Sequence, residues 1–171
     1  MLEQVTDAIV LDKEYNGDAD ARVHLFTRSL GKILVKATSA RKITSKLGAH
    51  LEPLTISTVR FVQKNHLPQI VDALRKDRLP FDYLPILRLI KNCAPEYEQD
   101  LFLWELCSRA TNLSLFSDRR IMIRTVLARL GYDPQFAQCE FCGGPSTYFS
   151  LDAASFFCGN CLSGAGECVM L

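Results

Sequence analysis

The fold is decided by residues 23–37, which read VHLFTRSLGKILVKA. This stretch predicts two short β-rich strands, residues 23–27 and 32–37, separated by a turn that ends at Gly31. A tight hairpin turn needs a residue with a positive φ, and glycine adopts such a φ without steric cost. The sequence therefore predicts an antiparallel hairpin around Gly31.

Three more β-rich stretches flank this hairpin, at residues 5–11, 54–62 and 67–74. Five short strands with no long helix between them predict a small β-barrel over residues 1–79. The connection over residues 38–53 is long for a hairpin, basic, and rich in small polar residues. Long loops on small barrels often carry function, so this loop is a candidate binding element.

A helical period replaces the strand pattern in the second half of the chain. Apolar residues recur at helical spacing over residues 83–91 and 101–115. A third helix is expected to begin after Ser117-Asp118 and to end at Gly131. The apolar faces of these helices are expected to form a core instead of a cofactor site. Residues 80–171 are therefore predicted to form a helical domain, and the fold class is α+β.

The composition excludes two classes of protein. The chain has 171 residues, of which 48% are hydrophobic and 23% are charged, which is too apolar for a disordered chain. No stretch approaches the roughly 20 apolar residues that a membrane-spanning helix needs. The first ten residues contain two acidic residues and no basic one, so no secretory signal is expected and the protein is predicted to be intracellular.

The net charge of +1 hides a basic segment. Residues 22–64 contain nine basic residues and one acidic residue, a local charge of +8, so the rest of the chain carries −7. This segment favours a polyanionic partner over a merely solvated face. Phe26 and Phe61 could stack on bases, but their polar neighbours alternate with them and predict burial. The candidate nucleic-acid contacts are Arg22, Lys36, Arg41, Lys42, Lys46, Arg60 and Lys64.

Four of the seven cysteines form two C-x2-C pairs separated by fifteen residues. The pairs are Cys139-Cys142 (CEFC) and Cys158-Cys161 (CGNC), and this spacing is typical of a zinc site. Zinc prefers four soft ligands in a tetrahedron, and a site with four thiolates is closed, so one structural Zn²⁺ is predicted over residues 139–161. Four unrelated thiols, or a redox pair, fit the pattern less well.

The remaining cysteines and the histidines indicate no catalytic centre. Cys93 and Cys107 lie on the predicted helical faces and are expected to be small core residues, and no role is assigned to Cys168. The three histidines are scattered, and no GxSxG, HExxH or phosphate-binding loop is present. The chain is therefore not expected to be an enzyme.

The order of four motifs resembles the bacterial RecO family of recombination mediators. These motifs are HLFTRSLGK at residues 24–32, ARKxxS at residues 40–45 leading into Leu51-Glu52-Pro53, and RLGYDP at residues 129–134 followed closely by CEFCG. The resemblance covers nearly the whole chain. It implies an OB-fold β-barrel followed by an α-helical domain that carries a four-cysteine zinc knuckle.

The resemblance also implies a function. It implies binding of single- and double-stranded DNA, annealing of complementary strands, and contact with the tail of single-strand DNA-binding protein (SSB) and with RecR during loading of the recombinase RecA. By position it assigns DNA contacts to Arg22, Arg41, Lys42 and Lys46, and zinc to the four paired cysteines. A DNA repair protein of this kind is expected in the bacterial cytoplasm, associated with the nucleoid.

Two departures from the family pattern are visible. The family often has Lys-Gly where this chain has Thr38-Ser39, which removes one positive charge and predicts weaker DNA binding. The family also continues for several dozen residues past the second C-x2-C pair, so the resemblance implies a short or truncated form. Two alternatives stay open at this point: an RNA-binding or transcription-associated module, and an enzyme with an open zinc site.

Overall fold

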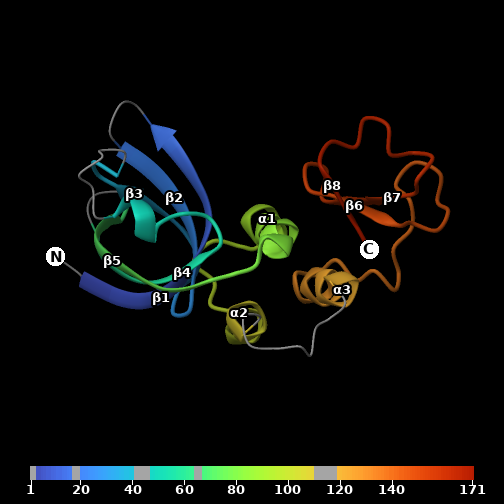
Figure 1. Cartoon of the computed structure of the whole chain (residues 1–171). Coiled ribbons are helices and arrows are strands. Elements are labelled where there is room, and N and C mark those ends of the chain that lie inside the picture. The colour runs from blue at the N-terminus through green and yellow to red at the C-terminus, as the bar shows by residue number, and fades with distance from the viewer. Residues whose placement is uncertain (1–2, 17–19, 41–46, 64–66, 110–118) are drawn as a thin grey trace. The chain divides into compact units, whose positions relative to one another are not determined.

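The computed structural model describes residues 3–16, 20–40, 47–63, 67–109 and 119–171 (Figure 1). It contains two compact units. The barrel unit comprises residues 1–83 and 95–112, and the knuckle unit comprises residues 84–94 and 113–171. None of the helices in the described ranges has the length and apolar character to cross a membrane. The predicted domain boundary after residue 79 stays a prediction.

Five strands of the barrel unit form a closed barrel in the order β1-β2-β3-β5-β4. The predicted number and location of the strands are confirmed. Most pairs are antiparallel, and β3 and β5 close the barrel with a short parallel pairing. The strands are β1 (Glu3–Asn16), β2 (Asp20–Thr27), β3 (Gly31–Ala37), β4 (Thr55–Val62) and β5 (Gln69–Arg78).

Strand β1 is longer than the sequence predicts, because its two ends pair with different neighbours. Residues 3–9 pair with β4, and residues 8–16 pair with β2. The register shifts between Val10 and Asp12, and an irregularity of this kind bends a strand. The sequence predicted only residues 5–11 as a strand, because the residues after Leu11 are polar and lack the apolar pattern of a strand.

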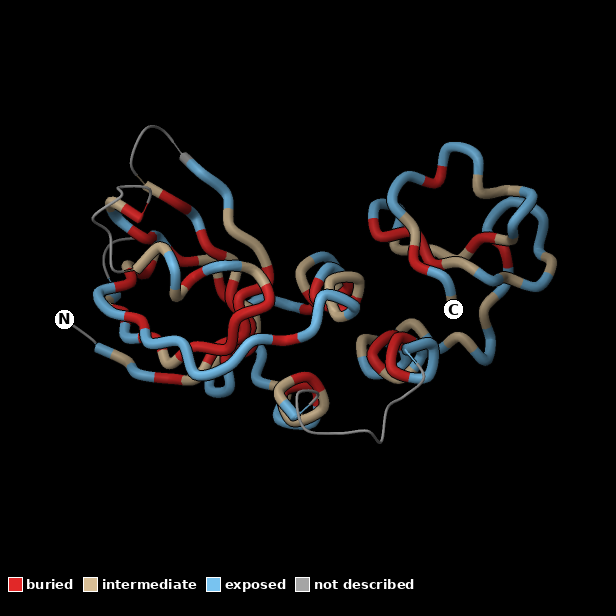
Figure 2. The backbone as a smooth tube through the Cα atoms, in the orientation of Figure 1, coloured by how far each residue is buried: buried red, intermediate tan, exposed pale blue. Residues whose placement is uncertain are grey.

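Buried residues alternate with more exposed ones along much of β2 and β3, and a cluster of buried apolar residues forms the barrel core (Figure 2). Phe26 is 1% exposed and Phe61 is 3% exposed, so the prediction that both are core residues is confirmed. Trp104 packs against Phe26 with 6.2 Å between the ring centroids. Because the only tryptophan of the chain lies in this contact, its fluorescence reports on the packing of α2 (Leu101–Ser108) against β2.

The hairpin between β2 and β3 has the predicted geometry. Gly31 has a φ of 68°, and the Thr27 hydroxyl accepts a hydrogen bond from the Leu30 N–H at 3.0 Å and donates one to the Gly31 carbonyl at 3.0 Å. A Cβ at Gly31 would lie 1.8 Å from the backbone oxygen of Glu98. Glycine is therefore required here both by the turn and by the chain segment packed on it.

One α-helix and two 3-10 helices complete the barrel unit. The Asp100 carboxylate accepts a hydrogen bond from the Leu103 N–H at 2.9 Å and caps the start of α2. The predicted helix over residues 101–115 ends at Ser108, and residues 110–118 lie outside the described part of the chain. The three elements are η1 (Gly48–His50), η2 (Phe81–Tyr83) and α2 (Leu101–Ser108).

The knuckle unit combines two packed helices with a small sheet. Helix α3 ends as predicted, because Gly131 follows it with a φ of 93°. The sheet has the order β7-β6-β8, and its third strand was not predicted. Helix α1 packs against α3. The elements are α1 (Leu84–Cys93), α3 (Arg119–Arg129), β6 (Tyr148–Ser150), β7 (Ser155–Phe157) and β8 (Cys168–Met170).

Candidate metal centre and basic surface

Two tight turns, one before β6 and one after β7, present the four paired cysteines. In the first turn the Cys139 N–H donates to the Gly144 carbonyl at 2.8 Å, and the Gly143 N–H donates back to the Cys139 carbonyl at 2.8 Å. Gly143 has a φ of 67°, which a residue with a side chain rarely adopts. In the second turn the Cys161 N–H donates to the Cys158 carbonyl at 3.1 Å. Each C-x2-C spacing therefore turns two thiols toward the same point.

The β6–β7 hairpin brings these two turns together. Its strands pair in register from Tyr148 opposite Phe157 to Ser150 opposite Ser155. The Glu140 N–H, which lies within the first turn, donates to the Phe156 carbonyl of β7 at 2.9 Å. This hairpin places residues 139–142 beside residues 158–161.

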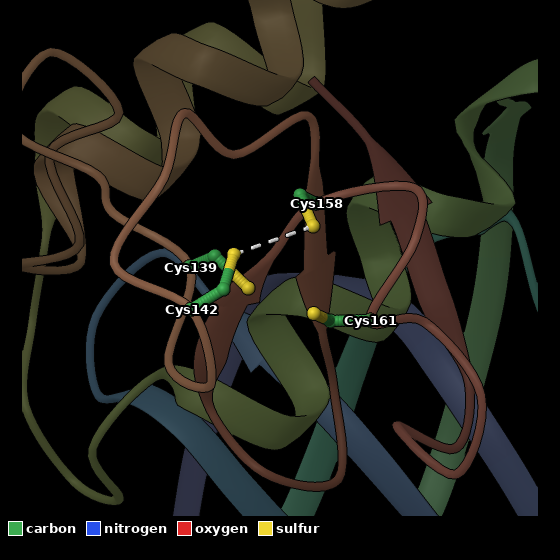
Figure 3. A group of neighbouring side chains, drawn as sticks. All are labelled: Cys139, Cys142, Cys158 and Cys161. Carbon is green, nitrogen blue, oxygen red and sulfur yellow. Dashed lines mark hydrogen bonds between the residues drawn. The ribbon is translucent and has the colours of Figure 1, made fainter.

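The four sulfur atoms form a compact cluster (Figure 3). All four Sγ atoms lie within 4.8 Å of one another, and those of Cys142 and Cys158 are 3.7 Å apart. A tetrahedral zinc ion with bonds of about 2.3 Å holds its sulfur ligands about 3.8 Å apart. All seven cysteines are free thiols. The donor set therefore fits a metal ion of the size and softness of zinc.

The electrostatics of the cluster favour a bound cation. Backbone N–H groups of Cys142 and Cys158 donate to the Cys139 sulfur and lower the pKa of this thiol to about 6, although its residue is only 2% exposed. Hydrogen bonding with the Cys158 thiol, together with burial, raises the pKa of Cys161 to about 12. Four touching thiols resist ionising together, because each thiolate repels the next. A divalent cation removes this repulsion and allows all four to bind as thiolates.

A small apolar cluster surrounds the sulfur atoms. Cys139, Phe157 and Ala165 are buried, and Leu162 packs against them. Phe141 covers one side, with its ring centroid 5.5 Å from that of Phe157. Four protein ligands leave no coordination position for a substrate, so a metal bound here would be structural.

The other three cysteines are not among the four clustered sulfur ligands, although Cys168 packs against the apolar cluster around them. Cys107 is fully buried in α2, as predicted, and burial raises the pKa of its thiol to about 12. Cys93 is half-buried at the end of α1. Cys168, which the sequence left without a role, lies in β8, and burial raises the pKa of its thiol.

Three of the predicted nucleic-acid contacts lie on the outer surface of the barrel. Arg22 on β2 and Lys36 on β3 are exposed and lie directly opposite each other in the strand register. Arg60 is exposed on β4. Arg41, Lys42, Lys46 and Lys64 lie outside the described residues.

Acidic side chains from elsewhere in the chain accompany these cations. The Lys36 Nζ lies 2.7 Å from a carboxylate oxygen of Asp20, and an Arg60 guanidinium nitrogen lies 2.9 Å from one of Glu3. Both acids precede the basic segment of residues 22–64, so the charge count along the sequence did not include them. Each cation is 47% exposed, and exposed ion pairs of this kind contribute only about 0–1 kcal/mol. A phosphate can therefore replace either carboxylate at small cost.

Strand β5 adds cations that the sequence analysis did not select. Arg75, Lys76 and Arg78 are exposed on it, eleven or more residues after the basic segment of residues 22–64 ends. The sequence RKDR at residues 75–78 was the available signal. Lys76 lies 2.7 Å from the Asp7 carboxylate. Burial raises the pKa of Asp7, but hydrogen bonds from Lys76 and Thr58 outweigh it, so the net pKa is lowered.

Lys13 and His50 hold the end of the basic loop on the barrel. The Lys13 side chain is only 4% exposed, and its Nζ lies 2.7 Å from a Glu52 carboxylate oxygen and 3.3 Å from the Gly48 carbonyl. The His50 Nδ1 accepts a hydrogen bond from the Arg75 N–H at 3.2 Å. The sequence did not select Lys13, because its partners lie more than thirty residues away along the chain.

These features define the class of the protein. A closed five-stranded barrel with cations on its outer face is OB-like, and such barrels bind oligonucleotides and oligosaccharides. Residues 1–75 match the family described as recombination protein O N terminal. The barrel region of the chain therefore matches the N-terminal domain of recombination protein O (RecO), in agreement with the resemblance inferred from the motifs.

The similarity extends beyond the barrel. The chain is 29% identical to the DNA repair protein RecO of Shouchella clausii, over 91% of this chain and 68% of that protein. It is 32% identical to the DNA repair protein RecO of Thermodesulfovibrio yellowstonii, over 80% of this chain and 61% of that protein. It is 27% identical to the DNA repair protein RecO of Streptomyces griseus, over 91% of this chain and 73% of that protein. The chain thus spans about two thirds of the length of these relatives.

Proposed function

We propose that this chain is a non-enzymatic mediator of DNA repair and homologous recombination. In this role it binds single- and double-stranded DNA and anneals complementary strands. The observation that carries the proposal is the match of this barrel and the following cysteine region to proteins named DNA repair protein RecO. The exposed cations of the barrel support a phosphate-binding role, since they occupy adjacent strands on the solvent face.

The proposed mechanism is charge neutralisation. Two DNA strands repel each other through their phosphates, so a surface that binds both lowers the barrier to pairing. Lys36 and Arg60 exchange their carboxylate partners for phosphates, and the exchange releases counterions from the DNA. Arg22 and the loop residues Arg41, Lys42 and Lys46, together with Lys64, extend this surface in the proposal.

We further propose that the N-terminal and C-terminal regions have different roles. Residues 1–79 form an OB-fold that binds DNA, and residues 80–171 form a helical domain stabilised by one structural Zn²⁺ on Cys139, Cys142, Cys158 and Cys161. The zinc ion supplies neutralisation of four thiolates, and the two turns and the hairpin supply their positions. In the cell the proposed partners are SSB and RecR, during loading of the recombinase RecA, in the bacterial cytoplasm at the nucleoid.

An annealing assay tests this function. The rate of pairing of two complementary oligonucleotides is measured with the full chain, on bare strands and on strands coated with SSB. Acceleration on both substrates supports the proposal. A strong preference for RNA of the same sequence over DNA would favour the RNA-binding alternative, and failure to accelerate DNA pairing would refute an annealing role.

A charge-matched pair of variants locates the surface. Lys36→Glu combined with Arg60→Glu should slow annealing, because both cations lie on the barrel. Arg119→Glu combined with Arg124→Glu makes the same change in net charge on α3 of the knuckle unit. Equal loss of annealing in both variants would show that only net charge matters and that the barrel surface has no special part.

A further inference from the structure

The barrel unit contains a cavity that the charged surface does not use. Its volume is about 190 Å³, and it lies where β1 begins, β4 ends and the β2–β3 turn meets the segment before α2. Gln4 pairs with Phe61 across β1 and β4, and the Pro68 carbonyl accepts a hydrogen bond from the Lys36 N–H at 2.8 Å. The residues that line the cavity are Gln4, Leu30, Phe61, Gln63, Pro68 and Tyr97.

Tyr97 is held at this cavity in an unfavourable backbone conformation. Its φ is 57°, in the left-handed region that residues with bulky side chains rarely adopt. Its N–H donates to the Lys32 carbonyl at 2.9 Å, and the adjacent Glu96 forms a β-bridge with Lys32. Strained residues persist where the surrounding structure fixes them, often at binding sites. Tyr97 is also 54% exposed, so an aromatic residue lines the cavity while remaining accessible to solvent.

The lining chemistry selects a flat, polar-edged ring. Leu30, Phe61 and Pro68 contribute apolar lining, and Gln4 and Gln63 add polar side chains at the edge. Pockets for whole drug-sized ligands measure about 300–1,000 Å³, so this cavity suits one ring system. The described lining residues include no cation, and a phosphate group would therefore stay outside.

We propose that this cavity receives a single unpaired nucleobase of a bound strand, stacked on Tyr97. The neighbouring cations fit this arrangement: Arg60 directly precedes the lining residue Phe61, and Lys36 is bonded through its backbone to Pro68. The backbone phosphates bind outside while one base enters. The inference deepens the proposed function and rests on it, because it assumes that the barrel binds a nucleic-acid strand.

This arrangement gives a reason for the barrel to distinguish single strands from duplexes. A base in a duplex is paired and stacked, and extruding it requires energy. A base in a single strand is available, and stacking on an aromatic ring tolerates every base because each has a π-face. The cavity therefore adds affinity for single strands without strong sequence preference.

An abasic oligonucleotide tests the proposal directly. We compare binding of the full chain to a fluorescently labelled thymidine oligonucleotide and to a strand of equal length whose central nucleotides lack bases. Stacking of one base on an aromatic side chain changes affinity by about fivefold or more. The wild type should therefore bind the intact strand at least about fivefold more tightly, at the same salt concentration.

Variants of Tyr97 and a matched control assign the effect. Tyr97→Ala should lower affinity for the intact strand to that for the abasic strand, with an unchanged salt dependence, because no phosphate contact is lost. Tyr97→Phe should retain the preference. Phe102→Ala removes another exposed aromatic residue of the barrel unit, 56% exposed on α2, and should also retain it.

The outcomes separate this inference from the proposed function. Equal wild-type affinity for the intact and abasic strands overturns the base site and leaves DNA binding intact, whereas binding to neither strand overturns the proposed function itself. If Tyr97→Ala fails to fold, photocrosslinking of a 5-bromodeoxyuridine oligonucleotide to the wild type decides. Adducts on the cavity residues support the site, and adducts confined to other residues refute it.

Discussion

Replacing Cys139 by serine should unfold the cysteine knuckle and leave the barrel intact. Cys139 is 2% exposed, and its sulfur lies within 4.8 Å of the other three. Serine cannot supply the soft thiolate that a four-cysteine zinc site requires. Zinc binding to small structural sites contributes about 10–16 kcal/mol to folding near neutral pH.

The knuckle has little else to stabilise it. Its strands β6, β7 and β8 have three residues each, and its large buried apolar side chains are Phe149, Leu151, Phe157 and Val169. Burial of such a side chain contributes about 1.5–3 kcal/mol. Four such side chains contribute about 6–12 kcal/mol, which the conformational entropy of more than thirty ordered residues offsets, so loss of zinc should expose residues 139–171 to solvent. The barrel unit has its own core and should remain folded.

Three measurements on the purified full chain check this prediction. Elemental analysis should find one zinc per chain in the wild type and none in Cys139→Ser. Limited proteolysis should cut the variant within residues 139–171, while the fluorescence of Trp104 stays unchanged because this residue packs in the barrel unit. Cys168→Ser is the matched control, since Cys168 is not one of the four clustered cysteines, and it should keep the metal.

A wild-type chain that contains no zinc when freshly purified would refute the metal site. A Cys139→Ser variant that keeps both zinc and protease resistance would show that Cys142, Cys158 and Cys161 hold the metal and the fold without Cys139. A simultaneous shift of Trp104 fluorescence would show that the two units do not fold independently.

Three further outcomes are expected. Changing Arg41 and Lys42 together to Ala should weaken binding to all DNA sequences alike. The plot of log affinity against log salt should become less steep by up to about 1.4, since each phosphate contact on a single strand contributes about 0.7 to its steepness. An unchanged slope in a salt titration would exclude both residues as phosphate contacts. Gly31→Ala should lower the free energy of unfolding of the barrel by more than about 1 kcal/mol in a denaturant titration. The reason is that Gly31 has a φ of 68° and the new Cβ would lie 1.8 Å from the backbone oxygen of Glu98. A variant as stable as the wild type would contradict the packing at this turn. The pKa of Asp7 is lowered on folding, so its carboxylate stabilises the native state above its unfolded value of 3.8, and this contribution is lost as the pH falls through the native pKa. Asp7→Asn should therefore be less stable than the wild type at pH 7 and approach it as the pH falls below 3.8, and a gap that stays constant with pH would contradict the ion pair.

Tertiary pairing changed the interpretation of the charges. The sequence placed Lys36 and Arg60 in a segment of charge +8, but the fold brings Asp20 and Glu3 to them from earlier strands. A charge count along the chain has no access to such neighbours, because antiparallel strands join residues that are sixteen and fifty-seven positions apart in these pairs. The surface is therefore less positive than the segment alone, although its cations stay exposed.

Features encoded within a few residues could be predicted from the sequence alone. The hairpin at Gly31, the end of α3 at Gly131 and the two C-x2-C turns each depend on local backbone geometry or on the reach of neighbouring side chains. The five strands and the α+β class followed from periodicity, because burial of one face imposes a period of two on strands and of 3.6 on helices.

Only the tertiary structure decided which distant elements meet. It set the barrel order, with β3 beside β5, and it divided the helices between the units, with α2 packed in the barrel unit and α1 in the knuckle unit. It also placed Tyr97 at a cavity with Gln4 and Gln63, residues that no motif connects. These contacts depend on the closure of the whole barrel. Residues far apart in the chain come together only when the strands between them pair in the correct register.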